Sequence, residues 1–210
     1  MSFATSTSFD MSVYALKPKF QNLLRPMVRF LAESGITANQ VTISAAFGSV
    51  LVGLVAGIGF PVHQLFLLMP VWLFLRMALN AIDGMLAREF GQKSARGAFL
   101  NELGDIASDI ALVLPFLAIS AFNPADIWAF ALVGVIVECA GLIGPLAGAS
   151  RRYDGPLGKS DRALVVGALG LWIGLGLPVA PAATWLWRAL VVLAVVTIIK
   201  RVNSGVAEAR

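Results

Sequence analysis

The chain has 210 residues, of which 58% are hydrophobic and only 13% charged, which places it outside ordinary soluble proteins. Its net charge of +4 does not indicate nucleic-acid binding, because the basic residues are spread over short segments between long apolar runs. The single Cys139 excludes an internal disulfide and a thiolate-based zinc site. These properties predict an all-α integral membrane protein.

Residues 1–34 are expected to form a polar tail followed by an amphipathic helix that lies on the cytoplasmic membrane surface. In residues 13–34, apolar side chains recur at helical spacing among four basic residues. Pro18 and Pro26 are expected to break or kink this helix.

Residues 35–210 are predicted to form one domain of six transmembrane helices, the first of them capped by Thr37 or Asn39. Each apolar segment has roughly the length needed to cross a hydrocarbon core of ~30 Å. The six segments run approximately over 40–60, 64–82, 97–122, 127–148, 162–178 and 182–202.

Lys and Arg residues gather in alternate connections between these segments, whereas the loops near Pro61, Asn123 and Pro178 contain none. The positive-inside rule therefore places both termini and the connection after the second segment in the cytoplasm, and the protein in the inner membrane. Arg76 lies deeper, within the second segment. We expect it to pair with Asp109 or Glu138, with a direct substrate contact as the alternative.

The stretch from Asp83 to Asp109 holds five of the twelve acidic residues between two apolar runs, a costly arrangement unless it serves chemistry. Its polar residues recur at helical spacing, so each helix presents a polar stripe and the two stripes are predicted to meet in a site. The stripes are Arg76, Asn80 and Asp83 on one helix, and Gly97, Asn101, Asp105 and Asp109 on the next.

This stretch reads Asn80-x-x-Asp83-Gly84-x-x-Ala87-Arg88, then eight residues, then Gly97-x-x-x-Asn101-x-x-x-Asp105. It resembles the signature of the CDP-alcohol phosphotransferase (CDP-alcohol phosphatidyltransferase) family, Asp-x-x-Asp-Gly-x-x-Ala-Arg followed by Gly-x-x-x-Asp-x-x-x-Asp. Six of the eight fixed positions match, and the two departures are Asn80 and Asn101 in place of Asp. The resemblance covers nearly the whole chain and implies six spans, a cytoplasmic active site and a homodimer.

The resemblance also implies roles for single residues. Mg²⁺ or Mn²⁺ would be held at the four positions of the family's acids, and the last of these would be the catalytic base. The implied metal ligands are Asn80, Asp83, Asn101 and Asp105, with Asp105 also the base. The residues implied to bind CDP-diacylglycerol are Asp83, Gly84, Ala87, Arg88, Gly97, Asn39 and Thr42, although helix capping explains Asn39 equally well.

A second basic segment, RRYDGPLGKSDR, is predicted to bind the acceptor alcohol through Arg151, Arg152, Lys159 and Arg162. Part of this charge is explained by topology alone. Members of the family that use phosphorylated acceptors carry basic residues here, whereas a choline or ethanolamine acceptor calls for acidic or aromatic groups. We therefore expect an anionic acceptor such as glycerol 3-phosphate, with inositol phosphate next.

The sequence thus predicts an enzyme of phospholipid biosynthesis that transfers the phosphatidyl group of CDP-diacylglycerol to a small polar alcohol and releases CMP. Asn80 and Asn101 leave open a weakened relative that binds a CDP-linked lipid without turnover. A six-span transporter is the third possibility, but the broken helices and inverted repeats typical of transporters are not visible.

Overall fold

The computed structural model describes residues 10–209. Residues 1–9 of the predicted tail, which was expected over residues 1–12, lie outside the described residues, and residues 10–12 belong to the first helix. Every regular element in the described range is helical, which confirms the all-α prediction. The long helices are α1 (Asp10–Glu33), α2 (Ala38–Ile58), α3 (Leu68–Glu89), α4 (Ala95–Val113), α5 (Pro124–Ile143), α6 (Lys159–Gly174) and α7 (Thr184–Glu208). Short 3-10 turns adjoin four of them, at His63–Leu67, Leu114–Ala118, Gly144–Ala147 and Pro181–Ala183.

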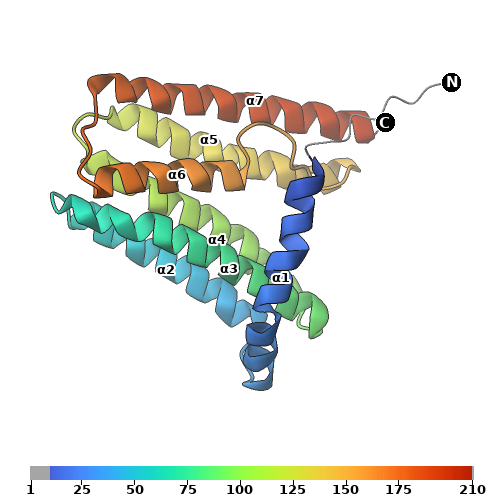
Figure 1. Cartoon of the computed structure of the whole chain (residues 1–210). Coiled ribbons are helices and arrows are strands. Elements are labelled where there is room, and N and C mark those ends of the chain that lie inside the picture. Colours follow the sequence, from blue (N-terminus) through green and yellow to red (C-terminus); the bar gives the residue numbers. More distant parts are fainter. Residues whose placement is uncertain (1–9, 210) are drawn as a thin grey trace.

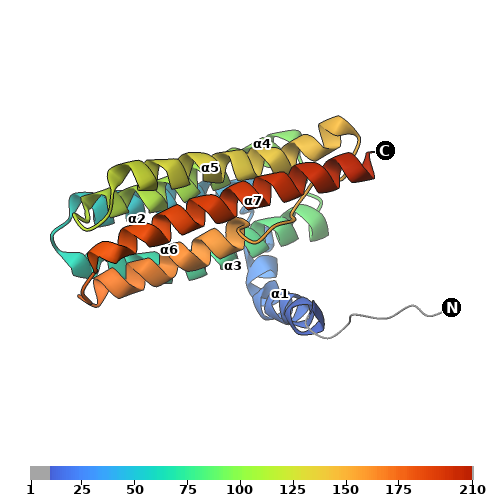
Figure 2. The same cartoon turned by 90° about the horizontal axis from the view of Figure 1, so that it is seen from above.

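Helices α2 to α7 run side by side in alternating directions, and α1 crosses the bundle at a steep angle (Figure 1). Figure 2 shows the same bundle from above, with the end of α7 on the side where α3 ends. We call this the motif end, because the connection between α3 and α4 lies there. The opposite end holds the connections near residues 59–62, 119–123 and 175–183.

Within residues 10–209, four helical segments are long and apolar enough to cross a membrane: Ala38–Ile58, His63–Glu89, Pro124–Ala147 and Thr184–Glu208. Helix α4 carries three acidic residues, Glu102, Asp105 and Asp109, and α6 has only 16 residues. Neither therefore matches the other four in length and composition. Six helices form the bundle, but the six predicted spans are not confirmed.

Helix α1 is continuous from Asp10 to Glu33, so Pro18 and Pro26 do not end it and the predicted break is wrong. A proline removes one backbone hydrogen bond, and the packing of α1 on α3 offsets that loss. Val28 is fully buried in this contact. Three apolar side chains of α1 stay exposed, and they agree with the predicted amphipathic character: Leu23, Met27 and Phe30.

In the apolar core, several aromatic rings pack around Trp187. The rings of Phe116 and Phe130 each lie 5.3 Å from that of Trp187, in edge-to-face contact. Phe66 and Phe122 extend the cluster. These rings pack the half of the bundle away from the motif end, which leaves the buried charges to the other half.

Small residues let the helices approach closely. A Cβ atom at Gly53 of α2 would lie 2.1 Å from the carbonyl oxygen of Ala111 on α4, a distance no side chain tolerates. At Gly141 of α5, it would lie 2.7 Å from the carbonyl oxygen of Arg152. These glycines therefore serve packing within the chain.

Candidate active site

A cavity of about 480 Å³, lined mostly by polar residues, lies at the motif end, between the start of α2, the end of α3 and the start of α4. We call it the motif cavity. Its walls include most of the residues predicted to bind CDP-diacylglycerol or a metal ion, namely Asn39, Thr42, Asn80, Asp83, Gly84, Ala87, Arg88, Gly97 and Asn101. The two polar stripes of the sequence therefore do meet.

Asp83 is the buried carboxylate of this cavity, with 7% of its surface exposed. Thr42 Oγ1 lies 2.7 Å from Asp83 Oδ2, closer than the 3.0 Å that separates it from the carbonyl oxygen of Ala38. The hydrogen bond to Asp83 joins α2 to α3 and orients the carboxylate.

The start of α2 is fixed by two further contacts. Thr37, rather than Asn39, is the N-cap, in a capping box with Gln40. The backbone N–H of Ala38 donates to Gln92 Oε1 at 2.6 Å, which ties α2 to the turn between α3 and α4. The rim of the cavity is thus held by backbone and side-chain hydrogen bonds.

Two glycines of the motif make room for polar side chains. A Cβ atom at Gly97 would lie 2.7 Å from Asn39 Oδ1, so glycine allows α4 to approach α2. A Cβ atom at Gly84 would lie 2.9 Å from Arg88 Nη1, so the guanidinium lies over the glycine. Arg88 is exposed and forms part of the cavity wall.

Asp105 lies one helical turn beyond Asn101, and the cavity wall does not include it. Its Oδ1 accepts from Arg76 Nη2 at 3.0 Å and from Asn80 Nδ2 at 3.4 Å. Its Oδ2 accepts from Lys159 Nζ. Both oxygens of the predicted base are therefore already engaged, and two of the three partners are cations.

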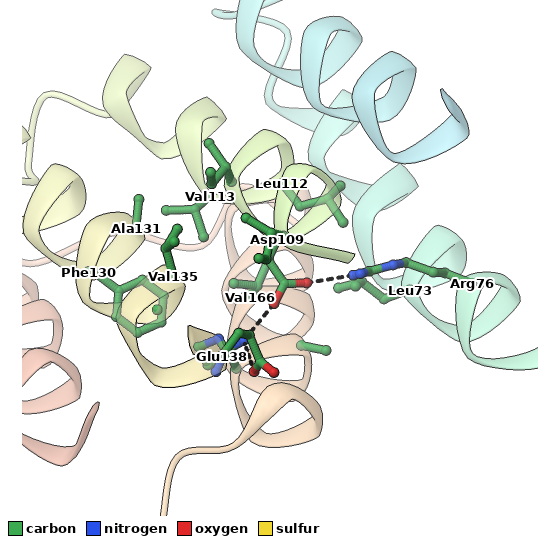
Figure 3. A pocket seen from close by; sticks show the side chains of 15 residues that line it. Leu73, Arg76, Asp109, Leu112, Val113, Phe130, Ala131, Val135, Glu138 and Val166 are labelled. Carbon is green, nitrogen blue, oxygen red and sulfur yellow. Dashed lines mark hydrogen bonds and ion pairs between the residues drawn. The ribbon is translucent and has the colours of Figure 1, made fainter. Parts of the chain in front are cut away.

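One turn further along α4 than Asp105, a network of buried charges joins α3, α4, α5 and α6 (Figure 3). Arg76 Nη1 donates to Asp109 Oδ1 at 2.8 Å, which confirms one of the two predicted pairings. Arg162 Nη2 lies 2.8 Å from both Asp109 Oδ2 and Glu138 Oε1. Glu138, the other predicted partner of Arg76, is thus paired with Arg162. The cavity at this network, about 20 Å³, has room for about one water molecule.

A second, mainly apolar cavity of about 650 Å³ runs between α3 and α6, and we call it the apolar groove. Its polar end consists of Arg76, Asn80, Lys159 and Ser160. Asn80 also belongs to the wall of the motif cavity, so this one residue borders both spaces. The apolar lining includes Pro70, Leu73, Phe74, Met77, Leu164 and Leu171.

Each of the four basic residues predicted to bind the acceptor already pairs with at least one acidic residue. Arg151 pairs with Glu102, and Arg152 pairs with Asp154 and Glu208. Lys159 pairs with Asp105, and Arg162 with Asp109 and Glu138. The hydrogen bonds from Arg152 hold the pKa of Asp154 below its ordinary value, and Asp154 is thus a firm counterion.

The predicted metal ligands offer few charges. Among residues 10–209, no group of three or more His, Cys, Asp or Glu side chains could hold a metal ion. Asn80 and Asn101 contribute amide oxygens only, and Asp105 is bound by Arg76 and Lys159. Asp83 with the two amides is a donor set that suits one Mg²⁺ or Mn²⁺, which takes its remaining oxygens from phosphates and water.

Several residues of this region were not predicted from the sequence. Gln92, Lys93, Ser94 and Glu102 also form walls of the motif cavity. Glu102 lies next to Asn101 but off the four-residue stripe, so its spacing gave no signal. Arg201 is 3% exposed and donates to the carbonyl oxygens of Val137 and Asp154. No sequence motif includes this residue.

Solved structures share this architecture. Phosphatidylinositol phosphate synthase (PgsA1) of Mycobacterium tuberculosis, in complex with manganese and citrate, aligns with a TM-score of 0.68 and 23% identity over 86% of this chain and 87% of that one. The same protein with CDP-DAG bound aligns with a TM-score of 0.69 and 22% identity over 86% and 92%. These likenesses show a common fold.

No protein-family model matches the chain. Archaetidylinositol phosphate synthase of Pyrococcus horikoshii is 29% identical over 174 residues, which cover 81% of this chain and 89% of that protein. Together with the motif and the fold, these relatives show that the chain belongs to the CDP-alcohol phosphotransferase family, a family of transferases. Inner membrane protein YnbA of Escherichia coli (strain K12) is more similar, at 44% identity over 201 residues, or 92% of this chain and 96% of YnbA.

Proposed function

We propose that the protein transfers the phosphatidyl group of CDP-diacylglycerol to a hydroxyl of a small phosphorylated alcohol and releases CMP. The observation that carries this proposal is the position of Asn80, which borders both the motif cavity and the apolar groove. A CDP-linked lipid joins a polar nucleotide to apolar chains through its phosphates. The two adjoining spaces match these two halves, with the nucleotide in the motif cavity and an acyl chain in the groove.

In this reaction, the acceptor oxygen forms a bond to the phosphorus of the phosphatidyl group, and the bond from that phosphorus to CMP breaks. Asp105 lies beside Asn80, where the two spaces adjoin, and accepts the proton of the acceptor hydroxyl. Arg88, exposed at the motif cavity, binds the phosphates of the nucleotide through charge-assisted hydrogen bonds. Thr42 keeps the Asp83 carboxylate in place.

Asp83 with the amide oxygens of Asn80 and Asn101 would hold a Mg²⁺ or Mn²⁺ ion. When bound, such an ion supplies positive charge that neutralises the pyrophosphate and the charge of the leaving CMP. The structure of PgsA1 in complex with manganese supports the proposal that this site holds a divalent ion.

The acceptor we propose is an anionic alcohol, of the glycerol 3-phosphate or inositol phosphate kind. The basic segment that includes Arg151, Arg152, Lys159 and Arg162 supports a phosphorylated acceptor. The two named relatives that make inositol phosphate lipids support the second kind. Because each of the four cations already has an acidic partner, an acceptor phosphate must compete with a carboxylate for them.

For the protein in its membrane, we propose that all six bundle helices cross the inner membrane, with both termini and the motif end in the cytoplasm. The one-sided distribution of Lys and Arg supports this orientation. The exposed apolar side of α1 would then rest on the membrane surface. The homodimer implied by the resemblance remains a proposal, tested by the mass of the purified particle.

The deciding experiment measures CMP release by the purified protein with CDP-diacylglycerol and Mg²⁺ or Mn²⁺. The acceptor panel contains glycerol 3-phosphate, inositol phosphate, free inositol and serine. Turnover with a phosphorylated acceptor is expected, and a clear preference for a neutral alcohol would refute the anionic acceptor. Asn80 and Asn101 favour one rival, a protein that binds the CDP-linked lipid without turnover. Binding of CDP-diacylglycerol without CMP release from any acceptor would establish it.

A further inference from the structure

Lys159, the first residue of α6, binds the Asp105 carboxylate. Its side chain is 32% exposed and Asp105 is 15% exposed, so the ammonium lies at the edge of an otherwise enclosed pair. Arg76 supplies a second cation to the same carboxylate, at 3.0 Å. The charge of Asp105 is thus balanced by side chains of the protein.

Asn80 fits this arrangement better than an aspartate would. Its Nδ2 donates to Asp105 Oδ1, at 3.4 Å. An aspartate at position 80 has no hydrogen to donate and would place a second carboxylate against the first. Two carboxylates at such a distance repel each other unless a cation lies between them. The amide of Asn80 and the ammonium of Lys159 therefore both stabilise the negative charge of Asp105.

The ammonium also faces the space where a lipid substrate would be held. Lys159 and Ser160 belong to the polar end of the apolar groove, next to Asn80. Asn80 in turn borders the motif cavity. A phosphoryl group that links a nucleotide in the motif cavity to an acyl chain in the apolar groove therefore has to lie beside Asn80.

We propose that Lys159 is a built-in cation of the phosphoryl-transfer site, and that the protein accordingly binds one divalent ion per chain. This inference rests on the proposed function and deepens it. The ion is held by Asp83 and the amides of Asn80 and Asn101, while Lys159 supplies at Asp105 the positive charge that a second ion would bring. Among the four basic residues proposed to attract the acceptor, Lys159 thus acts on the phosphoryl group of the donor.

The lysine also accounts for how Asp105 becomes available. The phosphoryl oxygens of the donor offer the ammonium a new anionic partner at the end of the groove. When Lys159 turns to them, Asp105 Oδ2 loses its hydrogen-bond donor and is open to the acceptor hydroxyl. Arg76 keeps the carboxylate in position meanwhile through Oδ1.

The test counts bound Mn²⁺ by electron paramagnetic resonance, on the full-length protein in nanodiscs with saturating CDP-diacylglycerol. The wild type is expected to bind one ion per chain. The triple variant Asn80→Asp, Asn101→Asp, Lys159→Gln is expected to bind two, with the spin coupling of neighbouring ions. The same acidic pair with Lys159→Arg keeps a cation at position 159, and its second ion should bind at least about tenfold more weakly than in the triple variant. Lys200→Gln, which removes an exposed lysine of α7, is the matched control and should bind one ion.

Two ions on the wild type would overturn this inference, and CMP release by the same sample would show that the proposed function nevertheless holds. A second ion bound equally tightly with arginine or glutamine at position 159 would show that the charge there is irrelevant, and would also overturn it. Failure of the wild type to bind Mn²⁺ and CDP-diacylglycerol at all would refute the proposed function itself. The wild-type count depends on no variant, so an unstable variant cannot obscure the result.

Discussion

Thr42 Oγ1 on α2 and Asp83 Oδ2 on α3 lie 2.7 Å apart, so a buried carboxylate of the motif is held by a hydroxyl 41 residues earlier in the chain. The resemblance implied that Thr42 borders the nucleotide. The contact with Asp83 gives it a second role, since it fixes the orientation of a residue proposed to bind metal.

The first prediction concerns this contact. Thr42→Val should lower the free energy of unfolding by about 1–3 kcal/mol, because a buried acceptor loses its donor. It should also weaken Mn²⁺ binding in the presence of CDP-diacylglycerol. Thermal melting and Mn²⁺ titration measure the two effects. Thr42→Ser keeps the hydroxyl and should behave as the wild type; equal losses in both variants would mean that the methyl group matters instead.

A second prediction concerns Asp105 as the base. Asp105→Asn should abolish CMP release while the protein still folds and binds CDP-diacylglycerol, because the amide cannot accept the proton of the acceptor. The assay is CMP release with glycerol 3-phosphate or inositol phosphate. Asp126→Asn, which breaks the pair with Arg188 at the opposite end of the bundle, should keep normal turnover. A tenth of the wild-type rate in Asp105→Asn would remove this residue as the base.

Arg88 is expected to act in donor binding. Arg88→Ala should raise the KM for CDP-diacylglycerol by about 10- to 100-fold, the loss expected for one charge-assisted hydrogen bond to a phosphate. The KM for the acceptor should change far less. Arg96→Ala removes a nearby exposed arginine of α4 and serves as the control. Similar effects of both variants would point to general attraction of anions rather than a specific contact.

The buried network should be a main source of stability. Asp109 bridges Arg76 and Arg162, so Asp109→Asn leaves two buried guanidinium groups short of charge. The free energy of unfolding should fall by about 3–5 kcal/mol. Glu89→Gln breaks the exposed pair with Arg25 and should cost less than about 1 kcal/mol. Denaturant titration in detergent compares the two, and equal costs would contradict the assigned importance of the network.

The apolar groove gives a prediction about chain length. Ala168→Trp places a large ring in the groove and should raise the KM for long-chain CDP-diacylglycerol much more than for a short-chain analogue. Leu132→Trp enlarges an exposed side chain of α5 and should leave both values unchanged. If the two donors are affected equally by Ala168→Trp, the groove does not hold an acyl chain.

The sequence predicted the helices well, because an apolar run of membrane length leaves a chain few alternatives to a helix. It erred where local rules compete with packing. Pro18 and Pro26 suggested a break in α1, yet the helix continues because its packing on α3 offsets a lost hydrogen bond. Asn39 and Thr37 were equal candidates for the cap of α2, and only the side-chain geometry selects Thr37.

The motif alone was enough to predict that Asn80, Asp83 and Asn101 share a wall, because a spacing of three or four residues fixes which side chains point the same way along a helix. Sequence also identified Arg76 as a buried cation in need of an acid. It could not show that Lys159, from the distant α6, binds Asp105, or that the four cations of the second basic segment take separate partners. The pairings of Lys159 with Asp105 and of Arg162 with Asp109 depend on how α4 and α6 are placed against each other. Spacing within one helix carries no information about the distance to another.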